Sequence, residues 1–132
     1  MKRFLLLMPL LLALALVSAA CGGADQETGV LEGHVTIGPL TPVVQEGVPE
    51  PTVAPDVYAA RQVVVYAADG RRELARVQID SHGDYRVALP VGSYLVDVNH
   101  VSIGGGIGLP QQVEIVEGET IRLDIEIDTG IR

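Results

Sequence analysis

The two-residue alternation of apolar and polar side chains constrains the fold of this chain more than any other feature. It is clearest at residues 120–127, TIRLDIEI, where every second residue is Ile or Leu and the residues between them are polar or charged. Successive side chains of an extended strand point to opposite faces, so this pattern predicts a strand with one face in a core and the other in solvent.

Six further segments are predicted to be strands: 30–37, 62–67, 73–79, 84–89, 93–98 and 112–116. Turn signals separate several of them, namely Ala-Asp-Gly-Arg at 68–71, Ser-His-Gly-Asp at 81–84, Pro-Val-Gly at 90–92 and Glu-Gly-Glu at 117–119. No helical periodicity of useful length follows residue 21. Short alternating strands with frequent turns predict an all-β fold, a single seven-stranded antiparallel Greek-key sandwich.

The first 20 residues have the three parts of an export signal. Lys2 and Arg3 are followed by an apolar run, FLLLMPLLLALALV at 4–17, and then by small residues at 18–20. A membrane-spanning helix needs about 20 apolar residues. This run of 14 is shorter and is stopped by small and acidic residues, so residues 1–20 are predicted to be a cleaved signal peptide rather than an uncleaved anchor helix.

Cys21 is the only cysteine and directly follows this leader, in Ala-Ala-Cys-Gly-Gly. A reactive thiolate needs a neighbouring base, a cation or a helix start, and a disulfide or metal site needs partners that one cysteine lacks. The placement resembles the lipobox of bacterial lipoproteins, although Ser18 stands where that family usually has Leu. The resemblance implies that Cys21 is lipid-modified and becomes the first mature residue. Ordinary signal peptidase cleavage, with Cys21 unmodified, is the alternative.

The mature chain is strongly acidic. Removing 20 of the 132 residues leaves 112, enough for one domain. Cleavage removes Lys2 and Arg3 from nine basic residues, while all 17 acidic residues remain, so the net charge is −10. Such a surface repels nucleic acid and anionic headgroups, and the lack of tryptophan argues against a dedicated glycan binder.

Two long segments interrupt the strand pattern. Residues 38–60 carry five prolines, which cannot donate to a strand ladder, and residues 99–110 hold four glycines within 104–108. Long loops in a compact domain are often functional, so both are candidate sites for a protein or peptide ligand. Residues 21–29, which begin with the lipidated cysteine, are predicted to form a flexible tether, and residues 30–132 the domain.

The segment at 79–98, IDSHGDYRVALPVGSYLVDV, resembles the carboxypeptidase regulatory-like domain of the transthyretin-like (prealbumin-like) sandwiches. The resemblance rests on turn and core residues: Asp80, Gly83, Tyr85, Leu89, Pro90, Gly92 and Tyr94. The opening GHVTIGPLTPV and the closing IEIDTGIR also resemble small secreted bacterial proteins with this domain, whose proline-rich loop carries two cysteines. This chain has Thr41 and Glu50 at the similar positions, which implies that a loop-clamping disulfide is absent. The resemblance identifies a fold and no site.

The sequence holds only weak candidates for catalytic or metal-binding sites. Asp128-Thr129-Gly130 copies the signature of aspartic proteases, but only two residues follow it, too few to build a substrate cleft. The three histidines, His34, His82 and His100, lack the short spacings typical of metal sites. A transthyretin-like enzyme branch that hydrolyses a purine-derived lactam ends in Tyr-Arg-Gly-Ser, which this chain lacks, and no serine lies in a Gly-x-Ser-x-Gly context.

The sequence therefore predicts a lipid-anchored protein on the extracytoplasmic side of a bacterial membrane, at the cell surface or in the periplasm. We expect a non-catalytic binding or accessory β-sandwich with no cofactor and no metal. Two alternatives remain: a small hydrolase or metal-dependent enzyme using His34, His82 or His100 with nearby carboxylates, and a peptide or protease-inhibitor module using the 38–60 loop.

Overall fold

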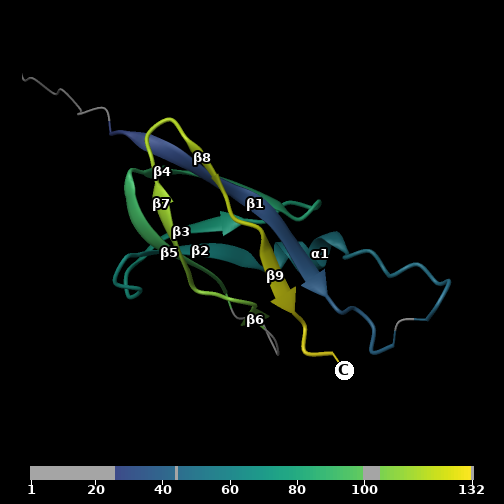
Figure 1. The fold of residues 1–132 in the computed structure, drawn as a ribbon. Helices are drawn as coiled ribbons and strands as arrows, with labels where there is room; N and C mark the ends of the chain where they lie inside the picture. The colour runs from purple at the N-terminus through teal and green to yellow at the C-terminus, as the bar shows by residue number, and fades with distance from the viewer. Residues whose placement is uncertain (1–25, 44, 100–104, 132) are drawn as a thin grey trace, which may run out of the picture.

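The computed structural model describes residues 26–43, 45–99 and 105–131, so the leader, Cys21 and His100 lie outside the described residues. The described chain is built almost entirely of strands (Figure 1). They are β1 (Thr28–Gly38), β2 (Gln62–Ala67), β3 (Glu73–Gln78), β4 (Asp84–Pro90), β5 (Gly92–Val98), β6 (Gly105–Gly106), β7 (Gln111–Ile115), β8 (Thr120–Arg122) and β9 (Ile125–Asp128). One short helix, α1 (Pro55–Ala59), precedes β2.

The strands form two sheets. One has the order β4-β1-β9-β6, with β8 also paired to β1, and the other has the order β3-β2-β5-β7. The chain changes sheet after β1 and after each of β3, β4, β5, β6 and β7, so most neighbouring strands are not consecutive in sequence, as a Greek-key sandwich requires. The predicted all-β sandwich is confirmed.

Two details differ from the sequence-based prediction. The described part of the chain has nine strands instead of seven, because the last predicted strand is divided into β8 and β9 and the glycine-rich segment contributes β6. The sandwich is also not wholly antiparallel, since β1 pairs in parallel with both β8 and β9. The chain reaches β8 from the other sheet rather than by a hairpin from β1, so nothing forces those strands to run in opposite directions.

The division between β8 and β9 has a local cause. Opposite it, the backbone of β1 comes so close at Gly33 that a Cβ atom there would lie 1.9 Å from the carbonyl oxygen of Leu123. The backbone N–H of His34 donates to the Asp124 side chain, at 2.8 Å, instead of to a backbone carbonyl. A carboxylate thus replaces one ladder acceptor, and the parallel ladder is interrupted.

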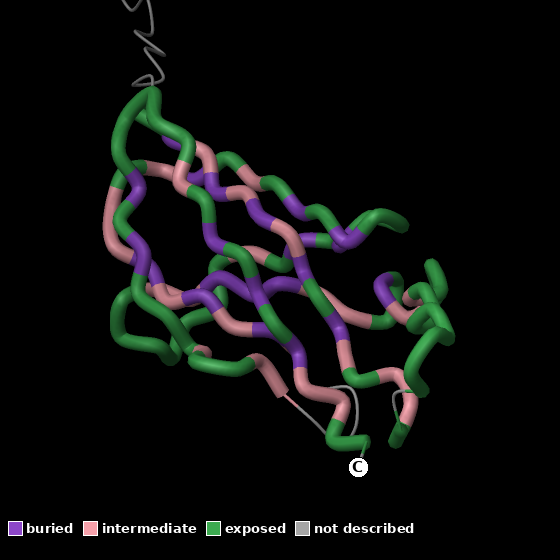
Figure 2. Tube along the Cα trace, turned by 45° about the vertical axis from the view of Figure 1, so that its right-hand side comes forward, coloured by how far each residue is buried: buried purple, intermediate pink, exposed green. Residues whose placement is uncertain are grey.

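The core lies between the two sheets. In β1 every second residue is buried, with Leu31 and Val35 wholly inaccessible, and Val63, Val65 and Val96 are equally buried in the facing sheet. Figure 2 shows this alternation of buried and less buried positions along the strands, with exposed residues concentrated in the connections. Within the described residues, no helix is long and apolar enough to cross a membrane.

β1 runs diagonally across the molecule, from one end of the sandwich to the other (Figure 1). At its start lie the turns at 90–92 and 117–119, held by bonds from the Val91 N–H to the Glu27 carbonyl and from the Gly118 N–H to the Thr28 carbonyl, both 3.0 Å. We call this end the tether pole. At the far end of β1 lie residues 39–43, 45–54, 105–110 and 128–131, which we call the loop pole. The first and last Cα atoms of this eleven-residue strand are ten steps apart, and at about 3.3 Å a step β1 is about 33 Å long.

Candidate functional site

The proline-rich loop of the loop pole is fixed at both ends. Leu40 and Val53 are partly buried against the core, so the segment between them projects from two packed anchors. At its start, the Thr129 hydroxyl donates to the Pro39 carbonyl at 2.5 Å, and the Thr129 N–H donates to the Gly38 carbonyl at 3.1 Å. These bonds tie the loop to the C-terminal segment.

The same bonds account for the Asp-Thr-Gly motif at 128–130. The Asp128 carboxylate accepts the N–H of Gly130 at 2.8 Å and so closes a local turn, while Thr129 holds the base of the loop. The motif therefore has a structural role at the end of β9.

The projecting part of the loop turns back on itself. The Val48 N–H donates to the Gln45 carbonyl at 3.1 Å, and Gly47 between them has a φ of 80°, in the region that favours glycine. Proline rings and two valines flank this turn. Val43 is 67% exposed and Val48 is 57% exposed, so the loop presents apolar side chains to solvent.

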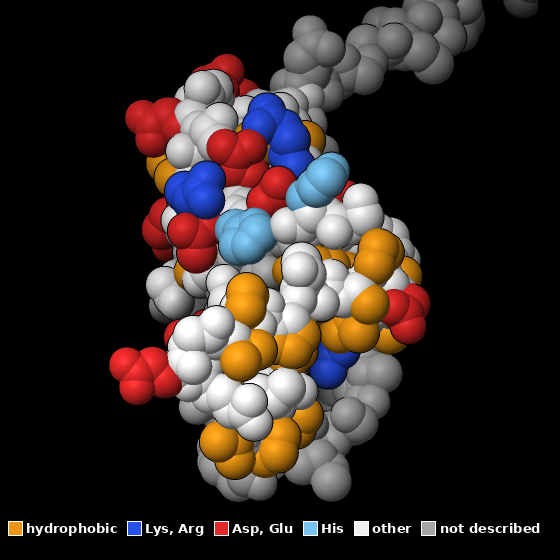
Figure 3. Space-filling model, turned by 90° about the vertical axis from the view of Figure 1, so that its right-hand side faces the viewer, with side chains coloured by type: hydrophobic (Ala, Val, Ile, Leu, Met, Phe, Trp, Pro, Cys, Tyr) orange, Lys and Arg blue, Asp and Glu red, His pale blue; other side chains and the backbone are white. Residues whose placement is uncertain are grey.

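Two adjoining hollows lie in this loop. The outer hollow, of about 340 Å³, is lined mainly by apolar side chains: Pro42, Val43, Val48, Pro49 and Pro51. The inner hollow, of about 200 Å³, lies between the loop and the sandwich and is bounded by Ile37, Leu40, Val53, Tyr58 and His34 among others. Figure 3 views the molecule from this side: hydrophobic side chains gather over the lower part of the face, and the histidines and most charged side chains lie above them.

Thr41 and Glu50, the positions at which the resemblance implies cysteines, line both hollows. The loop therefore brings these two positions to one place without a disulfide. Glu50 contributes the sole carboxylate among the described residues that line the hollows. Its side chain makes no hydrogen bond or ion pair within the described residues, and it is exposed. Sequence reasoning marked the loop as a candidate site but did not identify Glu50 as its charged group.

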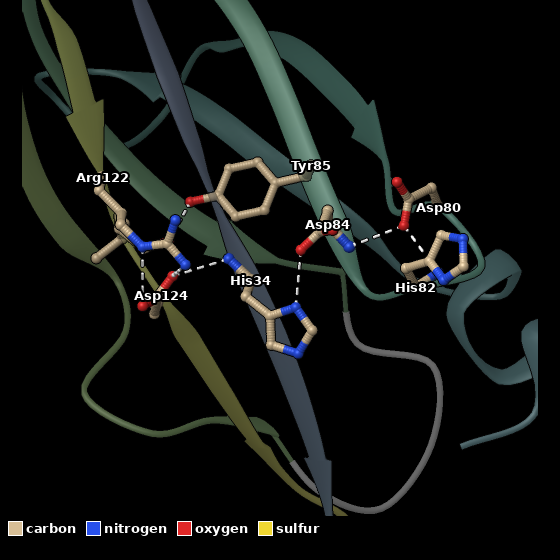
Figure 4. Close-up of polar contacts among 8 residues, drawn as sticks. His34, Asp80, His82, Asp84, Tyr85, Arg122 and Asp124 are labelled. Carbon is tan, nitrogen blue, oxygen red and sulfur yellow. Dashed lines mark hydrogen bonds and ion pairs between the residues drawn. The ribbon is translucent and has the colours of Figure 1, made fainter. Parts of the chain in front are cut away.

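A polar cluster lies beside the loop pole, on the outer face of the sheet that contains β1 and β4 (Figure 4). His34 and Asp84 are paired residues of β1 and β4, and the His34 Nδ1 lies 2.8 Å from the Asp84 carboxylate. The Asp80 carboxylate accepts the N–H groups of Asp84 at 2.9 Å and of His82 at 2.8 Å. The Asp84 N–H bond, helped by that of His82, lowers the pKa of Asp80, which is typical of a turn-closing carboxylate.

The structure brings His34 close to one carboxylate, but His82 contributes its backbone N–H to the cluster and His100 lies outside the described residues. Within residues 26–43, 45–99 and 105–131, no three His, Cys, Asp or Glu side chains are grouped to hold a metal ion. The geometry of the cluster is that of a cross-strand pair and a hairpin turn.

A third carboxylate in this cluster, Asp124, has a lowered pKa. The main cause is the N–H bond that it accepts from His34, and the second is the side chain of Arg122, whose Nη2 lies 3.1 Å away. Behind it, the Tyr85 hydroxyl donates to the Leu123 carbonyl at 2.5 Å. Burial raises the pKa of Tyr85 and keeps its phenol protonated. These groups hold the junction of β8 and β9.

The fold-signature residues from the sequence all have structural contacts. Gly83 has a φ of 88°, and a Cβ there would meet the Val35 carbonyl oxygen at 2.9 Å. The Tyr94 hydroxyl donates to the carbonyl of Pro90 at 2.6 Å, and burial raises the pKa of Tyr94. These residues shape the turns and the core and do not line the hollows.

Comparison with known proteins supports the fold. No family model matches the sequence, and no curated protein matches it. Among solved structures, the minor pilin GBS52 of Streptococcus agalactiae superposes with a TM-score of 0.52 at 21% identity, over 78% of this chain and 45% of the pilin. A DUF3823 family protein from Parabacteroides merdae has a TM-score of 0.47 at 17% identity, over 78% of this chain and 47% of that protein. This chain thus spans less than half the length of either, and its similarity to the pilin is one of β-sandwich fold.

Proposed function

We propose that this protein is a bacterial lipoprotein, anchored through lipid on Cys21 and facing the extracytoplasmic side, whose β-sandwich is a non-catalytic module that binds a protein or peptide partner at its loop pole. The observation that carries the proposal is the position of the loops. The described parts of both long connections, residues 39–43, 45–54 and 105–110, lie with residues 128–131 at the far end of β1, while the described chain enters the domain at the tether pole.

This arrangement suits a protein held at a membrane by its N-terminus. Because β1 begins at Thr28, the part of the predicted tether 21–29 that precedes the sheet is residues 21–27. These residues span at most about 24 Å when fully extended, so they would keep the tether pole near the lipid surface. The length of β1 then allows the loop pole to lie up to about 33 Å farther from that surface. Lipid on a cysteine anchors stably when two or more acyl chains insert, because each buried methylene adds about 0.8 kcal/mol.

The polar groups support a binding role over catalysis. Among the described residues, the carboxylates of the polar cluster accept bonds that close turns or pair strands. The loop pole instead presents an open apolar hollow with one carboxylate, which is the composition of a recognition surface.

The anchor is tested with Cys21→Ala, and Ser18→Leu serves as the matched control because it introduces the residue usual in a lipobox. We expect the membrane form of the wild type to exceed its polypeptide mass by attached lipid, and we expect Cys21→Ala to lose both the added mass and the membrane association. Ser18→Leu should keep both. Unchanged mass and partitioning in Cys21→Ala would refute lipidation.

The binding face is tested by photo-crosslinking in intact cells. A photoreactive residue is placed at Val43 in the loop pole and, as control, at Val91 in the tether pole, since both side chains are exposed. A discrete crosslinked partner from the Val43 position that is absent from the Val91 position is the expected result. Equal crosslinking from both positions would contradict a partner site at the loop pole.

A further inference from the structure

The exposed apolar side chains of this protein are concentrated at one end. Seven large hydrophobic side chains in the described residues are exposed, and four belong to the loop pole: Val43, Val48, Ile107 and Ile131. Two of them, Val43 and Val48, line the outer hollow together with three prolines. Each of these valines is more than half exposed, so a partner that covers it removes apolar surface from water and binds more favourably.

The loop pole is also acidic. Its described segments, 39–43, 45–54, 105–110 and 128–131, contain Glu46, Glu50 and Asp128 and neither lysine nor arginine. Arg61, the next arginine after the proline-rich loop, donates through Nη1 to the carbonyl of Val57, at 3.2 Å, and does not line the hollows. Arg132, which follows Ile131, lies outside the described residues. Elsewhere in the domain arginines lie beside carboxylates, as in the pairs Arg86–Glu32 and Arg122–Asp124. The carboxylate of Glu50 has no such partner among the described residues.

We propose that the outer hollow binds a cationic, apolar peptide segment, in which an aliphatic side chain covers Val43 and Val48 and a neighbouring arginine or lysine pairs with Glu50. The proposal rests on the binding role proposed above and names the chemistry of the partner. Glu50 is placed for this pairing because it lines both hollows and lies beside the apolar residues Pro49 and Pro51.

The negative charge of the loop pole argues against two other occupants of the outer hollow. A second copy of this chain would bring the same carboxylates against Glu46 and Glu50, and like charges in contact oppose association. An anionic lipid surface is repelled for the same reason. A basic segment gains from the charge of the pole, and its approach is accelerated by the net charge of −10 on the mature chain.

The test uses the lipid-anchored full chain in phosphatidylcholine nanodiscs and a short fluorescein-labelled peptide of alternating arginine and valine. Fluorescence anisotropy is measured against empty nanodiscs. Peptides of alternating glutamate and valine, and of alternating arginine and serine, separate the charged contribution from the apolar one. Val48→Ser and Glu50→Gln alter the hollow, and Val91→Ser and Glu117→Gln are the matched controls at the tether pole.

We expect the arginine–valine peptide to bind most tightly. Glu50→Gln should weaken its binding about three- to fivefold, since an exposed ion pair contributes modestly, and should reduce its salt dependence. Val48→Ser should weaken it by up to about tenfold through lost apolar contact. The tether-pole variants should bind like the wild type. All four positions are exposed, and unchanged far-UV circular dichroism melting confirms that each variant is folded.

The proposal is overturned if the glutamate–valine peptide binds as well as the arginine–valine peptide, if the loop-pole variants behave like the tether-pole variants, or if empty nanodiscs take up equal peptide. It is also overturned if Glu50→Gln changes the oligomeric state by light scattering while peptide binding stays absent, because the pole would then serve self-association. Crosslinking and lipid mass are measured separately. If the protein is attached to the membrane and crosslinks a discrete partner from the loop pole, but shows no preference for basic peptides, the proposed function stands and only the basic-peptide inference is rejected.

Discussion

Replacing Gly33 by alanine should destabilise the sandwich at the junction of β8 and β9. An alanine Cβ at this position would lie 1.9 Å from the Leu123 carbonyl oxygen and 2.6 Å from its carbon. Ordinary contacts of a Cβ begin near 3.4 Å, so the two backbones must separate by about 1.5 Å. The clash is with the backbone of Leu123 between β8 and β9, and rotation of a side chain cannot relieve it.

A displacement of this size breaks the bonds that cross the junction. The Leu123 N–H bond to the Glu32 carbonyl (2.9 Å), the Tyr85 hydroxyl bond to the Leu123 carbonyl (2.5 Å) and the His34 N–H bond to Asp124 (2.8 Å) all depend on this approach. At about 1 kcal/mol each, their loss costs about 3 kcal/mol. Strain in a packed core adds about 1–3 kcal/mol. A typical domain has a free energy of unfolding of about 5–15 kcal/mol, so the variant should be severely destabilised.

Gly38→Ala is the matched control, because Gly38 ends the same strand and a Cβ there would meet nothing within 4 Å. We expect this control to stay within about 1 kcal/mol of the wild type. Urea unfolding of the purified mature protein, followed by tyrosine fluorescence and far-UV circular dichroism, measures both. In a domain of this size a loss of 3 kcal/mol lowers the melting temperature by at least about 12 °C. If Gly33→Ala unfolds within 1 kcal/mol of Gly38→Ala, the argued close approach is wrong.

Three further predictions concern the same scaffold. Tyr85→Phe should lose about 1–3 kcal/mol of stability in urea unfolding, because the Leu123 carbonyl loses its buried donor; an unchanged midpoint would contradict this. Asp124 has a folded pKa below its unfolded value of 3.8, so its charge stabilises the fold above pH 3.8, and this contribution disappears as the pH falls through the lower folded pKa. Asp124→Asn should therefore show a smaller drop in melting temperature at acid pH than the wild type. An equal drop in both proteins would count against this reasoning. Thr129→Val removes the hydroxyl bond to the Pro39 carbonyl, so proteolysis of the 39–54 loop should be faster at an unchanged melting temperature; equal cleavage rates would argue against a clamp.

The sequence was sufficient for the layers of the fold because alternation reports which face of a strand is buried. Ile125 and Ile127 are buried and Glu126 is exposed, as the pattern at 120–127 predicts. The division of that segment at Asp124 was not predictable. Asp124 falls on the polar face of a regular strand, and its bond to the His34 N–H, 90 residues away in sequence, follows only from the register between β1 and β9.

The candidate site shows the same limit. Five prolines identified the 38–60 segment as a loop, and the resemblance singled out Thr41 and Glu50. That both residues line one hollow depends on the turn at Gln45–Val48 and on the bond from Thr129 to Pro39. The turn depends on the left-handed backbone conformation of Gly47, and the bond joins residues that are 90 positions apart in sequence. Neither feature can be read from the periodicity of side chains.

The scaffold and the proposed site draw on different residues, and this separates stability from recognition. The bonds that hold the β8–β9 junction converge on Leu123 and on Asp124 of the polar cluster, whereas Val48 and Glu50 are exposed on a loop anchored by Leu40 and Val53. Changes at sites without shared partners have nearly additive effects on stability. The hollow can therefore change its shape and charge with little effect on the free energy of unfolding, which is the property that the proposed recognition loop requires.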